Sequence, residues 1–367
     1  MNLPLPLPLT QQLQDASERA AHIRVQPLSA HTGAQIDGVD LTQPLNGDEI
    51  ATLRHALLRW KVIFFRNQHL SHEQHVAFAR QFGELTIGHP VFGHVEGHPE
   101  LYSIAKHRKA NRHEGQAEQR PWTGWHADVT AAHNPPFASI LRGVTIPPYG
   151  GDTQWTNLAA AFEALSEPFQ QFVSTLRGIH RFSPPAGTQA SSEYRQLVSN
   201  SKLVTEHPLV TVHPETGEKV LYISPGFLDR IVGVTPRESR VLLEYLWEHA
   251  VSQEFTVRFK WEPGSLAFWD NRSTAHLPPK DILRWTLTGS CTVPRWWGRC
   301  PWGWTGEHPP PLKGIRFLRR TLQPIEALTA GMPDSRCMHA GTGSHNKGCY
   351  LVQALALAGL AGLDIAA

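Results

Sequence analysis

Short apolar segments, separated by turns rich in glycine and proline, run through the first three quarters of the chain. Most of them alternate apolar and polar residues, which is typical of strands with one buried face. Residues 61–66 are largely apolar and indicate a strand buried on both faces. The pattern predicts strands at residues 23–28, 33–41, 61–66, 138–144, 209–212, 219–223, 255–259 and 265–269.

Helical spacing of apolar residues is confined to a few windows. Asn46 with Glu49, and Ser71 with Gln74, match the capping box that begins many helices. Two further helices are expected, one over residues 158–176 with an interruption at Pro168 and one over 235–250. Because these helices do not alternate regularly with the strands, the pattern favours a mostly β fold, a barrel or sandwich carrying helices, over a doubly wound sheet.

Composition and charge exclude several classes of function. The formal net charge is +2, from 34 basic and 32 acidic residues, so neither a nucleic-acid partner nor a membrane partner is indicated. The proline-rich start has no basic region, and no apolar run is long enough to span a bilayer, so we expect a cytoplasmic protein. A hydrolase is disfavoured because neither a Gly-x-Ser-x-Gly elbow nor an HExxH motif occurs.

A candidate metal site begins with His126 and Asp128. Residues two positions apart on an extended segment point to the same side, so one imidazole nitrogen and one carboxylate oxygen can bind one ion. Two ligands do not hold a metal, and His276, which follows the predicted strand 265–269, is the best third candidate. Two histidines and one carboxylate form the facial triad of non-haem Fe(II) oxygenases, which leaves positions open for cosubstrate and oxygen.

The chain resembles the TauD/TfdA family of Fe(II)- and 2-oxoglutarate-dependent dioxygenases. The resemblance implies a double-stranded β-helix (a cupin-like jelly roll) with His126, Asp128 and His276 on Fe(II), and with 2-oxoglutarate and O2 as cosubstrates. It also implies that Thr153 binds the distal carboxylate of 2-oxoglutarate, that His89 contacts an anionic substrate, and that the protein is a homodimer or homotetramer. Four segments carry the likeness: residues 33–41, 125–130, 149–157 and 269–276.

The polar segment 105–124 permits two interpretations. It is either a solvated surface loop or a mobile lid just before the metal ligands, whose cations would attract an anionic substrate.

The C-terminal part departs from the family pattern. The resemblance implies an arginine about a dozen residues after the distal histidine, where a planar cation would pair with 2-oxoglutarate. Arg284 comes earlier, so either a loop is shortened or the reading frame shifts near Leu283. We favour the frameshift, because all four cysteines and five of the twelve tryptophans follow Arg284. We therefore expect a disordered leader (1–22), a dioxygenase domain (23–290) and an atypical, largely disordered tail (291–367).

Two functions from different classes remain open on the sequence. The first is an enzyme that hydroxylates a small anionic organic molecule, such as a sulfonate, a sulfate ester or an aryloxyalkanoate, with release of succinate and CO2; Arg284 is then the local candidate for the cosubstrate's counter-ion. The second is a non-catalytic metal-binding jelly roll that has lost the 2-oxoglutarate arginine.

Overall fold

The computed structural model places most of the chain upstream of residue 280. The residues that the structure describes are 20–89, 94–103, 120–144, 146, 148–182, 196, 200, 203–279 and 349–355. The described chain begins with Ala20, whose side chain is buried, slightly before the predicted end of the leader at residue 22. Among the described residues, no helix is both long and apolar enough to cross a bilayer.

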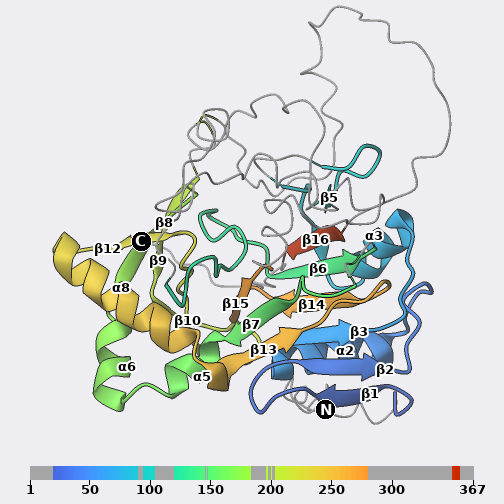
Figure 1. The fold of residues 1–367 in the computed structure, drawn as a ribbon, viewed down its shortest axis with the longest axis horizontal. Helices are drawn as coiled ribbons and strands as arrows, with labels where there is room; N and C mark the ends of the chain where they lie inside the picture. Colours follow the sequence, from blue (N-terminus) through green and yellow to red (C-terminus); the bar gives the residue numbers. More distant parts are fainter. Residues whose placement is uncertain are drawn as a thin grey trace, which may run out of the picture.

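The largest sheet has eight strands within the described part of the chain, in the order β1-β2-β3-β14-β6-β16-β4, with β5 also paired to β16. In Figure 1 its strands stack upward from β1, beside the N-terminus, to β16. Only β2 and β3 pair in parallel; the other pairs are antiparallel. Its strands are β1 (Arg24–Pro27), β2 (Ala34–Asp37), β3 (Val62–Phe65), β4 (Glu84–Leu85), β5 (Leu101–Ser103), β6 (Ala138–Gly143), β14 (Leu266–Asp270) and β16 (Cys349–Leu355).

Three smaller antiparallel sheets complete the described strands. The sheet that matters most for the site has the order β13-β7-β15. It is formed by β7 (Thr153–Asn157), β13 (Thr256–Phe259) and β15 (Thr274–Leu277). The others are β12-β8-β9 and the hairpin β10-β11, with β8 (Arg177–Arg181), β9 (Val204–Pro208), β10 (Val210–Val212), β11 (Lys219–Leu221) and β12 (Leu228–Ile231).

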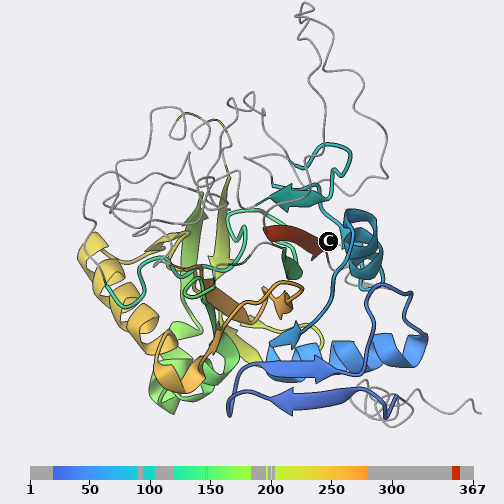
Figure 2. The ribbon, with the colours of Figure 1, turned by 45° about the vertical axis from the view of Figure 1, so that its right-hand side comes forward.

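The helices cover two separate regions of the sheets. α2 and α3 lie at one end of the molecule, and α5, α6 and α8 gather at the other (Figures 1 and 2). Both predicted capping boxes are present, at Asn46 and at Ser71, and a third forms at Thr235. The bounds are α2 (Gly47–Trp60), α3 (His72–Arg80), α5 (Leu158–Glu163), α6 (Glu167–Val173), α8 (Pro236–Ala250) and the 3-10 helix η1 (Gln253–Phe255).

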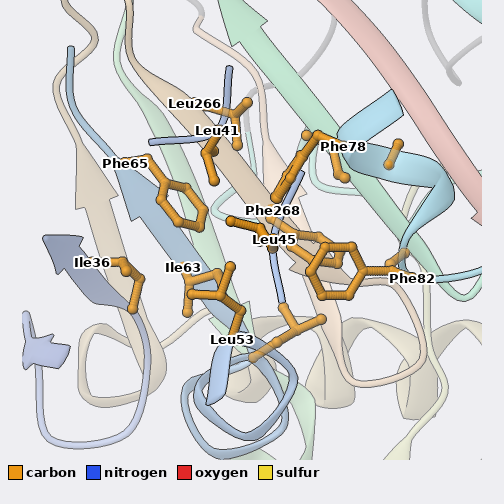
Figure 3. Packing of buried hydrophobic residues seen from close by; sticks show 14 of the residues in the cluster. Ile36, Leu41, Leu45, Leu53, Ile63, Phe65, Phe78, Phe82, Leu266 and Phe268 are labelled. Atoms are coloured by element: carbon orange, nitrogen blue, oxygen red, sulfur yellow. The ribbon is translucent and has the colours of Figure 1, made fainter. Parts of the chain in front are cut away.

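The central strands β3, β14 and β6 are buried on both faces because each face has its own apolar partner. On β14, Leu266 and Phe268 join the cluster that α2 and α3 cover, which also contains Ile63 and Phe65 (Figure 3). The alternate positions belong to a second cluster shared with β7 and β13. Side chains alternate along a strand. The second cluster therefore fills the space between the large sheet and β13-β7-β15; its members are Val62, Phe64, Leu141, Ile146, Trp155, Val257, Phe259, Trp261, Ala267 and Trp269.

Two expectations about secondary structure need correction. The helix expected over residues 158–176 is two helices, and the break precedes Pro168, which lies in the first turn of α6. Proline is tolerated there because it has no N–H that the first turn would need. The segment that carries His126 and Asp128 is not an extended strand: His126 makes a single bridge, and Asp128 begins a turn.

Part of the predicted tail is described. Residues 349–355 form β16, which pairs with β6 on one side and with β5 and β4 on the other. Residues 280–348 and 356–367 lie outside the described residues, so the predicted domain boundaries and the frameshift remain predictions.

Candidate metal centre

The two histidines of the predicted triad face each other across a pair of backbone hydrogen bonds. The N–H of His126 donates to the carbonyl of His276 at 2.9 Å, and the N–H of His276 donates to the carbonyl of His126 at 2.7 Å. His276 lies on β15, opposite Trp155 of β7. The strand therefore fixes the position of the turn that carries His126, although 149 intervening residues separate the two in sequence.

Three donor atoms converge at this bridge. The Oδ1 atom of Asp128 lies 3.7 Å from Nε2 of His126 and 3.8 Å from Nε2 of His276, and one ligand atom from each residue falls within 4.8 Å of the others. The side chains of Asp128 and His276 are each 10% exposed and that of His126 is 27% exposed. The group is therefore accessible from the His126 side and enclosed by protein on the other.

Both imidazoles can offer a lone pair through Nε2. The Nδ1 atom of His126 lies 3.1 Å from the carbonyl oxygen of Gly124, which can only accept, so Nδ1 donates its proton there and Nε2 is the ring atom directed at Asp128. The pKa of His276 is lowered to about 3, mainly by burial and also by nearby His126, while Asp128 acts in the opposite direction. Two neutral imidazole nitrogens and one carboxylate oxygen form a donor set that suits Fe(II).

The turn after His126 is held by side chains from a distant loop. The Ser224 hydroxyl accepts a hydrogen bond from the Ala127 N–H at 3.1 Å. A Cβ at Gly226 would lie 3.0 Å from the Cβ of His126, so glycine lets this loop approach the imidazole closely. Val129 has φ of 52°, in the left-handed region that a β-branched residue rarely adopts. The turn is thus strained and depends on its contacts.

Polar groups behind Asp128 form a continuous chain of hydrogen bonds. The Ser139 hydroxyl on β6 donates to Oδ2 of Asp128 at 2.7 Å, and the side-chain amide of Asn271 donates to Ser139 Oγ at 2.8 Å. The indole N–H of Trp269 donates to Oδ1 of Asn271 at 2.9 Å. Neither Ser139 nor Asn271 was among the site residues predicted from the sequence. The available signals were a serine within an apolar strand and an asparagine inside the segment 269–276.

A charged cluster anchors the turn between β14 and β15. Asp270 is fully buried, with Arg272 at 2.5 Å and the Nε2 atom of His213 at 3.0 Å. Burial by itself would raise the pKa of Asp270, but Arg272 and His213 outweigh it and hold that pKa well below its usual range. Glu215 lies 2.7 Å from Arg272 and ties the β10-β11 connection to the same turn. The cluster fixes the chain on both sides of Asn271.

Thr153 lies on the inner face of β7. It is two positions before Trp155, the residue opposite His276, and its side chain is buried. The indole N–H of Trp261 donates to Thr153 Oγ1 at 2.9 Å. Because this oxygen already accepts from Trp261, the hydroxyl proton of Thr153 is available as a donor.

His89 lies near the triad and begins a row of aromatic rings. Its ring centroid is 5.1 Å from that of Tyr102 and 5.7 Å from that of Phe182. Phe182 stacks on Phe227 at 5.4 Å, and Phe227 meets the ring of His126 edge-on at 6.0 Å. Burial lowers the pKa of His89 to about 3; Asp128 opposes the shift and His126 adds to it. The row therefore connects a neutral imidazole with the triad.

Two sequence predictions fall where the structure describes little or nothing. Arg284, the predicted counter-ion of 2-oxoglutarate, lies outside the described residues. The same is true of residues 104–119, which make up most of the predicted lid.

Comparisons with known proteins agree with this geometry. An alpha-ketoglutarate-dependent sulfate ester dioxygenase from Pseudomonas putida is 35% identical over 289 residues, covering 75% of this chain and 92% of that protein. An alkylsulfatase from Acinetobacter baylyi is 34% identical over 286 residues, covering 74% and 86% of the two chains.

Solved structures resemble the fold. A taurine dioxygenase from Burkholderia xenovorans superposes with a TM-score of 0.62 at 66% identity, over 71% of this chain and 84% of that one. A complex of AAD-2 with Mn(II) and N-oxalylglycine has a TM-score of 0.56 at 26% identity, over 70% and 91% of the two chains. The family model described as "Taurine catabolism dioxygenase TauD, TfdA family" matches residues 24–278, which include all three residues of the triad. The chain therefore belongs to the TauD/TfdA family and is a 2-oxoglutarate-dependent dioxygenase.

Proposed function

We propose that this dioxygenase hydroxylates a small anionic organic substrate on an Fe(II) ion held by His126, Asp128 and His276. The observation that carries the proposal is the convergence of these three donor atoms on one partly open point. The cofactors that family membership implies are Fe(II), 2-oxoglutarate and O2. We also propose that the sheets form a double-stranded β-helix, which is supported by the sheet-rich architecture and the TauD-type structural neighbours.

When bound, iron, 2-oxoglutarate and O2 would supply the redox chemistry: 2-oxoglutarate would be oxidised to succinate and CO2, with one atom of O2 entering succinate and the other converting a substrate C–H bond into C–OH. The protein's part is to bind and orient. We assign Thr153 to the distal carboxylate of 2-oxoglutarate, because its hydroxyl proton is free to be donated while Trp261 occupies its oxygen. Arg284 remains the proposed cationic partner of that carboxylate.

His89 is the proposed contact for the substrate's anionic group. A neutral imidazole offers one N–H donor, which can bind an anionic oxygen beside the apolar rings of Phe182 and Phe227. Sulfate esters, sulfonates and aryloxyalkanoates share such an anion beside an apolar group. If hydroxylation occurs at a carbon that bears an ester oxygen, the hemiacetal-like product collapses to an aldehyde or ketone and releases the anion.

An anaerobic titration tests the enzyme against the non-catalytic alternative, and the family comparisons favour the enzyme. Adding Fe(II) and then 2-oxoglutarate should produce the weak visible charge-transfer band of the chelate, and admitting O2 should yield succinate. Iron uptake without the band would support the non-catalytic metal-binding protein. A panel of one alkyl sulfate, one alkylsulfonate and one aryloxyacetate then identifies the substrate class by the product released together with an aldehyde: sulfate from the sulfate ester, sulfite from the sulfonate and a phenol from the aryloxyacetate.

A variant of His89 separates its role from that of the triad. His89→Phe keeps a ring beside Tyr102 and Phe182 but removes the donor, so KM for the anionic substrate should rise by about tenfold or more, because one hydrogen bond to a charged group is lost. Binding of Fe(II) should be unchanged. An unchanged KM would remove His89 from the substrate site. The assignments of Thr153, Arg284 and His89, the oligomeric state and the cytoplasmic location all stay predictions.

A further inference from the structure

The hydrogen-bond chain behind Asp128 has a direction that a single donor sets. An indole N–H can donate and cannot accept, so Trp269 requires the oxygen of the Asn271 side chain to face it. The amide nitrogen of Asn271 is then turned toward Ser139, and Ser139 Oγ must accept from it. The remaining hydroxyl proton of Ser139 is therefore directed at Asp128 Oδ2.

Packing and backbone contacts hold the residues of this hydrogen-bond chain in place. Trp269, Asn271 and Ser139 are buried, and Trp269 and Ser139 are directly opposed in the register of β14 and β6. The backbone N–H of Asn271 donates to the carbonyl of Phe137 at 2.8 Å. None of these side chains can easily leave its hydrogen bonds, because a buried polar group without a partner costs free energy of folding.

The chain separates the two oxygens of Asp128 by function. Oδ2 is occupied by the hydroxyl proton of Ser139, whereas Oδ1 is the oxygen nearest to Nε2 of both histidines. A carboxylate can bind a cation through one oxygen or through both, and the second mode would use an additional coordination position. We propose that Trp269, Asn271 and Ser139 are positioning residues that make Asp128 a one-oxygen ligand, so that the second oxygen of the carboxylate would not take a coordination position needed by cosubstrate or oxygen.

This inference rests on the proposed function, and Mn(II) binding tests it without turnover. The apo protein is titrated with Mn(II), and the enhancement of water-proton relaxation reports how many exchangeable waters the bound ion keeps. In Ser139→Ala, Oδ2 is released and can take a position from water. Relaxation per bound ion should fall by about a third, because one of three open positions is lost. The dissociation constant should rise about 10- to 100-fold, as is usual when a partner of a ligand is removed.

Two further variants test the direction of the chain and guard against a folding defect at Ser139. Asn271→Asp has the same shape but replaces the amide donor by a carboxylate oxygen, which draws the Ser139 proton away from Asp128; it should show the relaxation loss of Ser139→Ala. Trp269→Phe keeps a ring but lets the Asn271 amide turn over, so it should show a smaller loss in the same direction.

Thr32→Val is the matched control. It removes a buried hydroxyl that donates to the carbonyl of Phe255, away from the triad, and should leave both Mn(II) measurements unchanged. Normal relaxation and affinity in Ser139→Ala and Asn271→Asp would overturn the inference while leaving the proposed function intact. Failure of the unmodified protein to bind Mn(II) or Fe(II) would instead overturn the proposed function.

Discussion

His276 and Asp128 point at the same position but are held in different ways. His276 belongs to β15, where ladder hydrogen bonds to β7 and contacts with Trp155 and Trp269 fix its ring. Asp128 begins a turn outside any strand, followed by the strained Val129 and held by separate polar contacts. A strand ligand takes its position from apolar packing, whereas a turn ligand depends on a few individually placed side chains.

Removing a metal ligand from either the strand β15 or the turn at Asp128 should have the largest effect on metal binding. Asp128→Ala and His276→Ala should each weaken Fe(II) or Mn(II) binding by more than about 100-fold, beyond the loss usual for outer partners of ligands. Isothermal titration of the apo variants measures it. His94→Ala, a change at an exposed histidine, is the control. Tight metal binding in Asp128→Ala would mean that the turn contributes no ligand and that Asp128 and His276 do not form one site.

Acid should destabilise the part of the fold that supports the turn. His180 lies against Thr130 in that turn, and burial lowers its pKa to about 3; burial also holds the pKa of His75, on the buried face of α3, well below 6.5. The unfolded chain binds these two protons near pH 6.5, whereas the folded chain does not. Stability is therefore greatest above pH 6.5 and should fall between pH 6 and 5; His180 by itself should contribute about 1 kcal/mol of that loss, since a group of this kind contributes at most about 1.4 kcal/mol per pH unit.

Guanidinium unfolding of the apo protein at the two pH values measures this loss. His180→Phe removes one titrating group and should reduce the loss between pH 6 and 5 by about 1 kcal/mol, whatever its effect on absolute stability. A pH dependence identical to that of the unmodified protein would show that His180 is protonated in the folded state.

Crowding the turn from the outside should have an intermediate effect. In Gly226→Ala the new methyl group would meet the Cβ of His126 at 3.0 Å, so the imidazole must shift by a few tenths of an ångström. Metal affinity should fall about tenfold, at the lower end of the range for partners of ligands. Gly47→Ala, where nothing lies within 4 Å, should leave affinity unchanged. Equal affinities in the two variants would show that the Ser224–Gly226 loop does not position His126.

The smallest effect is expected when valine is replaced by alanine, once in a strand and once in the turn. Val62 on β3 and Val129 in the turn are both buried, but only Val129 has a left-handed backbone. Val62→Ala should cost about 2 kcal/mol of unfolding free energy through lost burial and a cavity. Val129→Ala should cost about 1 kcal/mol less, because removing the branch relieves part of the backbone strain. Equal losses in chemical denaturation would indicate that the turn is not strained.

Prediction from sequence was more successful for the elements held by apolar packing than for the segments held by separate polar contacts. The strands β3, β6 and β14 and the helices α2, α3 and α8 have strong local signals in apolar period and capping residues, and they were found close to their observed bounds. β8, β9 and β12 were missed because their residues are mixed in polarity and half-exposed. The extended segment expected through His126 and Asp128 is limited to the single bridge at His126, and Asp128 begins a turn, because contacts with distant residues decide the backbone there.

The sequence by itself determined which residues could bind a metal and which segments must be buried, because donor chemistry and apolar period are properties of the residues. Only the tertiary structure decided that Ser139 and Asn271 stand behind Asp128, that Trp261 occupies the oxygen of Thr153, and that Gly226 lies against His126. These contacts join residues far apart in the chain. Their partners are set by the register of strands and the packing of the sheets, which no local pattern contains.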